Sequence, residues 1–304
     1  MTSYKEKLTE LFSSKGDKEA SLASKEDGFS RVFITGDLHG DIDITKLNTK
    51  SFPEQKELTK NDYLIITGDF GLIWNDEPSK IEKNWSEWLT TRTYTTIVVL
   101  GNHENYNRIE KLPEVEMFGG TVWKYTDSIF ILKRGAVYEI AGKKYFTIGG
   151  AMSTDQQFRT EGQSWWKQEI PSSEEFDNGL KTLHKHEYEV DYVLTHTAPA
   201  RVIQQYMNSC TDTYINEIKS QMKEGEVVDE GILYDRVVDN FIDKEYFEER
   251  KDEVARYLDV VAYGITPLTF KRWFFGHFHD NWTSKDGKYT LLYKNIVELE
   301  HNDG

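Results

Sequence analysis

Two histidines stand one residue apart at the end of an aromatic run in the stretch FFGHFHD, residues 274–280. Side chains at positions i and i+2 of a strand point to the same face, so His277 and His279 can present two imidazoles to one site. Imidazole is a common metal ligand, and metal binding is the chemistry that this spacing could serve. A pair of this kind is more often a surface or core feature when it stands alone. The metal hypothesis therefore requires further ligands from other parts of the chain.

Further polar side chains follow short apolar runs, at the points where strands are expected to end. They are Asp37 and His39 in GDLHG, Asp69 in GDFG, Asn102, His103 and Glu104 in GNHE, and His196 in LTHTAP. Together with the opening pair, these segments contain five of the eight histidines. Ligands and catalytic groups of α/β proteins gather at the carboxyl ends of strands. The sequence therefore predicts a metal centre built from several strand ends.

The ordered motifs DxH, GD, GNHE, H and GHxH resemble those of the calcineurin-like metallophosphoesterases, and the segment 149–171 resembles one found in small bacterial and phage-type members of that family. The resemblance covers most of residues 31–297 and implies a four-layer αββα sandwich with a two-metal site at the strand ends. Matched by motif position, the implied ligands are Asp37, His39 and His279 for one metal, Asn102, His196 and His277 for the second, and Asp69 as the bridge.

The ligand types agree with two transition-metal ions. Imidazole with carboxylate and amide oxygen suits Mn²⁺, Fe or Zn²⁺ better than Mg²⁺, and we favour Mn²⁺. Two divalent cations against two aspartates and one hydroxide leave about +1, enough to attract a phosphate. Metals roughly 3.5–4 Å apart lower the pKa of a bridging water and hold the phosphoryl oxygens for in-line attack. Hydrolysis by a metal-bridged hydroxide needs no Ser or Cys nucleophile.

His103 is the candidate catalytic residue. It resembles the histidine of the family motif GNHE, which lies close to the scissile bond and protonates the leaving oxygen or stabilises its charge. The alternative is a hydrogen-bonding role without substrate contact. Glu104 is expected to orient a neighbouring group, and Asp41, just after GDLHG, is a second candidate for such a supporting role.

The segment 149–171, GGAMSTDQQFRTEGQSWWKQEIP, offers candidate substrate contacts. Arg159 could clamp a phosphate, and Trp165 or Trp166 could stack on a base. The alternative is that both tryptophans close the core beside the preceding hairpin. The family branch that includes protein phosphatases continues its second motif as GDxVDRG, with an arginine that grips phosphate. The corresponding stretch here, GDFGLIW, has no arginine, which argues against a phosphoprotein substrate.

Short apolar runs rich in β-branched residues predict the strands that carry the motifs. They lie at 31–35, 63–67, 96–100, 188–195 and 271–275, with a hairpin at 135–150, further strand character at 288–299 and a helix at 78–93. The pattern indicates one α/β domain over 31–304, preceded by an arm or short helix at 1–30. A helical insertion is expected over about 200–265. We expect it to cap the metals and restrict the site to small substrates, with packing alone as the alternative.

Composition limits the classes of function. The 304 residues include 37 Lys+Arg and 52 Asp+Glu, a net charge of −15, which argues against a stable complex with nucleic acid. Apolar content of 38% supports a packed core, and the single cysteine, Cys210, excludes an intramolecular disulfide. No stretch of about 18 apolar residues predicts a membrane span. A cytoplasmic protein is the simplest expectation.

The sequence thus predicts a binuclear metal-dependent phosphoesterase acting on a small phosphomonoester or phosphodiester, with a nucleotide as one candidate. A non-catalytic binding scaffold with the same fold and a nuclease are the alternatives. The intact ligand set and the intact His103 argue against the scaffold. A basic surface stripe would favour the nuclease, and the sequence shows none.

Overall fold

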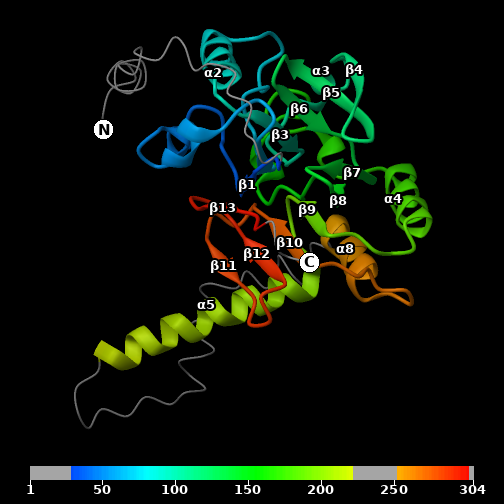
Figure 1. Ribbon diagram of the computed structural model, residues 1–304. Coiled ribbons are helices and arrows are strands. Elements are labelled where there is room, and N and C mark those ends of the chain that lie inside the picture. Colours follow the sequence, from blue (N-terminus) through cyan, green and yellow to red (C-terminus); the bar gives the residue numbers. More distant parts are fainter. Residues whose placement is uncertain (1–28, 222–251, 301–304) are drawn as a thin grey trace.

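Two β-sheets packed face to face form the centre of the computed structural model, which describes residues 29–221 and 252–300 (Figure 1). In sheet order, the first sheet contains β13 (Ile296–Glu298), β1 (Val32–Thr35), β2 (Tyr63–Thr67), β3 (Thr95–Val99), β6 (Ile129–Leu132), β5 (Gly120–Thr126) and β4 (Glu114–Met117). The second contains β11 (Trp282–Thr283), β12 (Tyr289–Leu291), β10 (Arg272–Phe275), β9 (Tyr192–Thr195), β8 (Lys143–Ile148) and β7 (Ala136–Ile140). The central strands of each sheet run parallel, namely β1, β2, β3 and β6 in one and β8, β9, β10 and β12 in the other.

Helices cover the outer face of each sheet. The helices are α2 (Lys80–Thr90), α3 (Tyr106–Ile109), α4 (Ser173–Lys185), α5 (Ala200–Gln221) and α8 (Glu253–Tyr263), with 3₁₀ turns at Ile44–Leu47, Pro53–Glu57, Gln156–Phe158 and Lys167–Glu169. One apolar cluster lies between α2 and the first sheet, a second between the first and second sheets, and a third between the second sheet and α4, α5 and α8. The layers are therefore α, β, β, α, as predicted.

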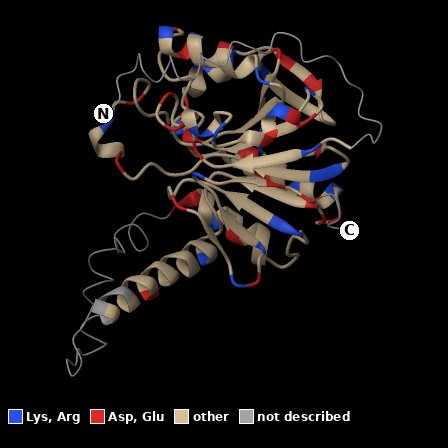
Figure 2. Ribbon diagram, turned by 60° about the vertical axis from the view of Figure 1, so that its left-hand side comes forward, with Lys and Arg blue, Asp and Glu red and all other residues tan. Residues whose placement is uncertain are grey.

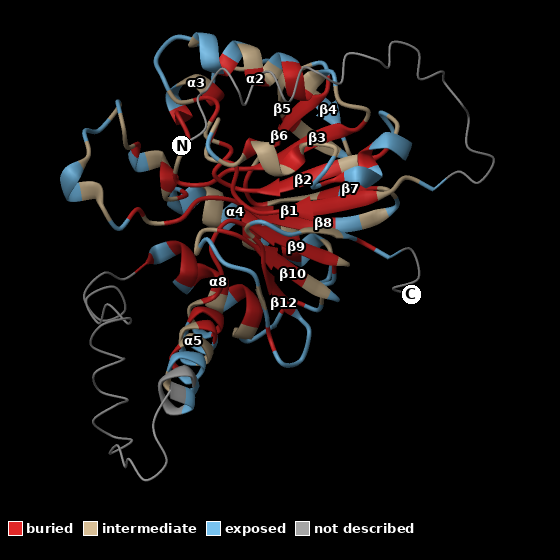
Figure 3. Ribbon diagram, turned by 90° about the vertical axis from the view of Figure 1, so that its left-hand side faces the viewer, coloured by how far each residue is buried: buried red, intermediate tan, exposed pale blue. Residues whose placement is uncertain are grey.

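Alternation along each strand explains why the core strands are apolar throughout. In β2, Leu64 and Ile66 face the helices while Ile65 faces the second sheet. In β9, Leu194 faces the first sheet and Val193 faces the helices. Strands buried on both faces show continuous apolar runs instead of polar alternation, and the two sheets are buried along most of their length (Figure 3).

Local signals set the helix ends. Ser79 caps α2 by accepting a hydrogen bond from the backbone N–H of Glu82. Ser172 and Glu175 form a capping box at α4, in which each side chain accepts from the backbone N–H of the other. The expected helix at 78–93 is thus confirmed as α2.

The predicted insertion begins with α5 and ends with α8. The first turns of α5 are buried at Val202, Ile203 and Tyr206, and α8 packs into the same cluster. The outer part of α5 runs away from the two sheets, and Tyr214 there is exposed (Figures 1 and 2). Residues 222–251 of the expected insertion lie outside the described residues, so the cap over the metals stays a prediction. None of the described helices is both long and apolar enough to cross a membrane.

The strands predicted at the motifs are all present, each within about two residues of an expected boundary except β9, which starts four residues late at Tyr192. Strands β4, β5 and β6, which extend the first sheet over Glu114–Leu132, were not predicted from the sequence, and neither was α4. The expected N-terminal arm lies outside the described residues, apart from its last two positions. The domain boundaries therefore stay a prediction.

Candidate metal centre

The predicted ligands lie just past the carboxyl ends of five strands. Asp37 and His39 follow β1, Asp69 follows β2, Asn102 follows β3, His196 follows β9, and His277 and His279 follow β10. Parallel neighbours end at the same edge of a sheet, so each sheet brings its ligands to one edge. The face-to-face packing of the sheets then joins the two edges.

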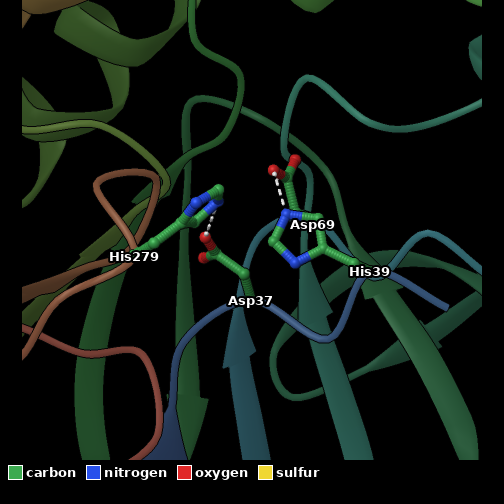
Figure 4. Close-up of side chains that lie close together, drawn as sticks. All are labelled: Asp37, His39, Asp69 and His279. Atoms are coloured by element: carbon green, nitrogen blue, oxygen red, sulfur yellow. Dashed lines mark ion pairs between the residues drawn. The ribbon is translucent and has the colours of Figure 1, made fainter. Parts of the chain in front are cut away.

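Four of these residues form a compact group (Figure 4). Asp37, His39, Asp69 and His279 each offer one ligand atom, and these atoms lie within 4.8 Å of one another. Nε2 of His39 is 3.4 Å from Oδ2 of Asp69, and Nε2 of His279 is 3.4 Å from Oδ2 of Asp37. Both carboxylates are buried, whereas the His279 side chain is 53% exposed. Two buried carboxylates this close together require compensating positive charge.

A second group adjoins the first through Asp69. Nε2 of His196 lies 3.2 Å from Oδ1 of Asp69 and 3.0 Å from Oδ1 of Asn102, and the rings of His196 and His277 are 5.0 Å apart. Asp69 thus directs Oδ1 toward this group and Oδ2 toward His39. A carboxylate with one oxygen in each group is the arrangement that a bridge between two cations requires.

Hydrogen bonds to the far side of two imidazoles fix which nitrogen faces the site. Nδ1 of His39 lies 2.9 Å from Oδ2 of Asp43, and Nδ1 of His196 lies 2.9 Å from the carbonyl oxygen of Thr67. Both partners are acceptors, so each Nδ1 carries the proton and each Nε2 is directed inward. Partners of this kind orient histidine ligands and raise their basicity. Tyr293 extends the first contact, because its hydroxyl donates to Oδ1 of Asp43 at 3.1 Å.

The electrostatics of the side chains follow from this geometry. Desolvation opposes protonation of His39 and His196, but the charge and hydrogen bonds of Asp69 outweigh it and raise the pKa of each to about 9. Burial alone would raise the pKa of Asp69, but His196 and His39 hold it well below its usual range. Desolvation lowers the pKa of His277 to about 3, which keeps this imidazole neutral. A cation that binds here therefore replaces protons on two histidines.

Backbone conformation sets the ligands apart from the rest of the chain. Among the described residues, eight non-glycine positions have positive φ, and four of them are predicted ligands: His39, Asp69, His277 and His279. Such conformations cost about 1–3 kcal/mol each and cluster at functional sites. Their concentration in these loops is independent support for a functional site here.

Two motif glycines make room for ligands from other strands. A Cβ on Gly68, which has φ of +99°, would lie 2.1 Å from Nδ1 of His196. A Cβ on Gly276 would lie 2.1 Å from Oδ1 of Asp37, whose two oxygens accept from the N–H of His277 at 3.1 Å. The Gly-Asp and Gly-His pairs of the motifs are thus required by close packing between strand ends.

His103 lies at the edge of both groups. Its Nε2 is 4.0 Å from Oδ2 of Asp69, its backbone N–H donates to Oδ1 of Asp69 at 2.9 Å, and its side chain is 25% exposed. Burial lowers the pKa of His103. Trp74 stacks on the imidazole with ring centroids 5.7 Å apart and an angle of 26° between planes. Trp74 ends the stretch GDFGLIW and was not among the predicted site residues.

The three predicted substrate contacts have different positions. Trp166 is buried in the core of the first sheet, 1% exposed, and packs edge-on against Trp74 with centroids 5.2 Å apart. This agrees with the core alternative for Trp166 and leaves it no face for substrate. Trp165 is half-buried and pairs through its backbone with Glu161. Arg159 lies 6.0 Å from the centre of the Trp74 ring, and its charge contributes to the lowered pKa of His103. Arg159 is therefore the predicted contact that lies beside the site.

The supporting residues differ in part from those expected. Glu104 is buried and accepts from the backbone N–H groups of Phe70, at 2.7 Å, and Gly71, at 3.4 Å, so it orients the loop that carries Asp69. Desolvation raises the pKa of Glu104 to about 8. Asp41 makes no hydrogen bond to a described ligand, and Asp43 contacts His39 instead. The spacing of four residues between His39 and Asp43 was a signal that the sequence contained.

The donor set fits divalent cations. Carboxylate, imidazole and carboxamide groups converge from separate strand ends, and the histidines already direct Nε2 inward. Histidine-rich sites of this composition suit Mn²⁺, Fe or Zn²⁺. The arrangement can hold cations beside His103, whose imidazole could donate or accept a proton.

Comparison with known proteins agrees with this site. The model of the calcineurin-like phosphoesterase family matches residues 30–281, a range that includes every predicted ligand. The comparison with curated proteins gives no match. Because the family match spans most of the chain, the protein belongs to the calcineurin-like phosphoesterases, hydrolases that act on phosphoric ester bonds.

Proposed function

We propose that the protein is a binuclear phosphoesterase that hydrolyses a small phosphomonoester or phosphodiester, with a nucleotide as one candidate. The double contact of Asp69 carries the proposal, since its two oxygens face separate groups of ligands. In this proposal Asp37, His39 and His279 hold one cation, Asn102, His196 and His277 hold the other, and Asp69 is shared. Imidazole donors suit Fe and Zn²⁺ and oxygen donors suit Mn²⁺, and among these cations we favour Mn²⁺.

The chain contributes orientation and a proton. When bound, the two cations supply Lewis acidity and an acidified water for attack on phosphorus. Thr67 and Asp43 keep two imidazoles turned with Nε2 inward, and the N–H of His277 holds the Asp37 carboxylate. His103 acts as general acid, giving its proton to the leaving oxygen. Catalysis of this kind contributes about 10²–10⁴-fold.

Arg159 supplies the phosphate contact in this proposal. Its Nε donates to Asp155 at 2.6 Å, and one terminal nitrogen donates to the carbonyl oxygen of Ser164 at 3.0 Å. These bonds hold the guanidinium near Trp74. An arginine held in advance loses less conformational entropy when it binds an oxyanion.

The alternatives receive less support. A non-catalytic scaffold does not need an inward-facing His103 together with a complete ligand set. A nuclease needs a basic groove. Among the described residues, Lys and Arg are interspersed with Asp and Glu instead (Figure 2). We also propose a cytoplasmic location, which the single cysteine supports.

The test is a substrate panel with chelator-treated protein, before and after addition of Mn²⁺. The panel contains nitrophenyl phosphate, bis-nitrophenyl phosphate, nucleoside monophosphates, cyclic nucleotides, dinucleotides and single-stranded DNA, with Asp69→Ala as the control for contaminating phosphatase. Hydrolysis that depends on Mn²⁺ and is absent from the control supports the proposal and separates monoester from diester. Two bound Mn²⁺ ions without hydrolysis of any substrate would support the scaffold, and preference for DNA would support the nuclease.

A further inference from the structure

The carboxamide of Asn102 has a fixed orientation. Its side chain is buried, its Oδ1 lies 3.0 Å from Nε2 of His196, and its Nδ2 donates to Oγ of Ser153 at 3.0 Å. Ser153 follows β8 and lies 51 residues from Asn102 in the sequence. The contact is therefore a tertiary one and not a property of the GNHE loop itself.

Glu169 determines how the Ser153 hydroxyl can act. Oγ of Ser153 donates to Oε2 of Glu169 at 2.6 Å, while Oε1 accepts from the backbone N–H of Ser153 at 2.8 Å and from Nε2 of Gln156 at 2.7 Å. Glu169 is fully buried. A serine hydroxyl has one proton, and here that proton points at Glu169. The lone pairs of Oγ are then left to accept from Asn102.

The direction of the hydrogen bonds that link Asn102, Ser153 and Glu169 matters for metal binding. A carboxamide has one oxygen and one NH₂ group of nearly equal size, and only the oxygen can bind a cation. Rotation of the amide by 180° would turn Nδ2 toward the metal site and place Oδ1 against Ser153, whose proton is already used. The hydrogen-bond chain from Asn102 through Ser153 to Glu169 opposes this rotation.

We propose that Ser153 and Glu169 are positioning residues that hold the Asn102 oxygen toward the second metal site. The proposal rests on the proposed two-metal function but concerns binding of the ion rather than turnover. It also gives a reason for the buried carboxylate of Glu169, whose hydrogen bond to Ser153 links it to Asn102 without direct contact. Partners of metal ligands typically account for about 10–100-fold in metal affinity.

Glu169→Gln is the sharpest variant because it changes hydrogen-bond direction with almost no change in volume. The backbone N–H of Ser153 and Nε2 of Gln156 both donate to Oε1 of Glu169. In the variant they favour the glutamine oxygen at this place, so the glutamine NH₂ group must face the Ser153 hydroxyl. The serine hydroxyl then receives a hydrogen bond and turns its own proton toward Asn102. We expect the Asn102 amide to rotate and the affinity of one Mn²⁺ ion to fall about 10–100-fold.

Ser153→Ala, with Ser153→Thr as the variant that retains a hydroxyl, tests the other link. The comparison is repeated in an Asn102→Asp background, because a carboxylate has two equivalent oxygens and needs no orientation. We expect Ser153→Ala to weaken one Mn²⁺ ion in the otherwise wild-type protein and to have less than about threefold effect, or a favourable one, in the Asn102→Asp background. A loss of Mn²⁺ affinity that appears with Asn102 but not with Asp at that position shows that Ser153 acts through the Asn102 side chain. General damage to the fold would lower the affinity in both backgrounds.

The measurement is calorimetric titration of chelator-treated protein with Mn²⁺, together with metal content after gel filtration and thermal melting without metal. Equal losses in both backgrounds would mean a merely structural role, and unchanged affinity in Glu169→Gln would exclude the orienting chain; either result overturns the proposal. If Ser153→Ala does not fold, the Glu169→Gln titration decides alone. Wild-type protein that binds two Mn²⁺ ions without hydrolysing the panel contradicts the proposed activity but leaves this test valid.

Discussion

The two halves of the centre hold their ligands in different ways. The half with Asp37, His39 and His279 is open, since His279 is 53% exposed, and its orienting partner for His39 is the charged side chain of Asp43. The half with His196 and Asn102 is buried, and its orienting partners are the backbone carbonyl of Thr67 and the hydroxyl of Ser153. We expect the open half to exchange its cation readily and the buried half to be coupled to the fold.

Asp69 is the strongest test, because it belongs to both halves. Asp69→Ala should remove both cations and lower kcat/KM by at least about 10³-fold, or about 4 kcal/mol of transition-state stabilisation. Metal analysis and nitrophenyl ester hydrolysis measure the two effects. Asp69→Asn is the matched variant, since it keeps the shape and one oxygen donor. If Asp69→Ala retains two ions and normal turnover, the Asp69 carboxylate does not join the two halves.

His103 lies beside both halves and is predicted to bind neither cation. His103→Gln should retain both Mn²⁺ ions and lose about 10²–10⁴-fold in kcat on esters with poor leaving groups. The loss should be smaller on nitrophenyl esters, because nitrophenolate needs little protonation. The check is the slope of log kcat against leaving-group pKa for variant and wild type. Parallel slopes would remove the acid role.

Paired variants of the two halves test the contrast directly. His279→Ala should weaken one cation while the melting temperature without metal stays near that of the wild type, since the side chain is half exposed. His196→Ala should weaken the other cation and also lower the melting temperature, because it leaves a buried cavity and removes a partner of Asp69. Equal melting temperatures for the two variants would abolish the proposed difference between the halves.

Proton release should accompany metal binding in both halves. The pKa of His39 and of His196 is raised to about 9, so both imidazoles are protonated at pH 7 and must lose a proton before Nε2 can bind a cation. Apparent Mn²⁺ affinity should therefore rise with pH, about tenfold per unit for each histidine, and level off above about pH 9. His277, with its pKa lowered to about 3, should release none. Titration in buffers of different ionisation enthalpy counts the protons, and a count of zero at pH 7 would contradict the pairing with Asp69.

The sequence was most informative where chemistry and strand ends coincide. Asp37, Asp69 and His196 follow apolar runs closely, so sheet geometry alone brings them together. The orienting partners were harder to predict, since a backbone carbonyl such as that of Thr67 carries no sequence signal, and Ser153 lies 51 residues from Asn102 in the sequence. The edge strand β4, Glu114–Met117, was missed because it is short and three of its four residues are exposed, unlike the doubly buried strands of the centre.

Trp166 shows the limit of reasoning from residue type. A tryptophan near an arginine can stack on a base or fill a core, and composition does not separate the two. In the structure Trp166 fills the core and supports Trp74, which in turn stacks on His103. The aromatic side chain beside the site is therefore Trp74, from the loop after β2. In that loop the comparison with the motif GDxVDRG had drawn attention only to the absence of an arginine.

Trp74 gives the smallest expected effect and tests whether His103 is held independently of both halves. The stacking at 26° between planes restricts rotation of the imidazole, so Trp74→Leu should let the ring move without touching any predicted ligand. We expect a loss of about two- to twelvefold in kcat, which corresponds to about 0.5–1.5 kcal/mol for an aromatic pair. Trp74→Phe retains a ring and should recover most of the rate, and both variants should bind Mn²⁺ as the wild type does. If Trp74→Phe restores kcat only on substrates with poor leaving groups, the effect of Trp74 acts through proton donation by His103. A rise in KM alone, with kcat unchanged, would show that Trp74 contacts substrate rather than positioning the histidine.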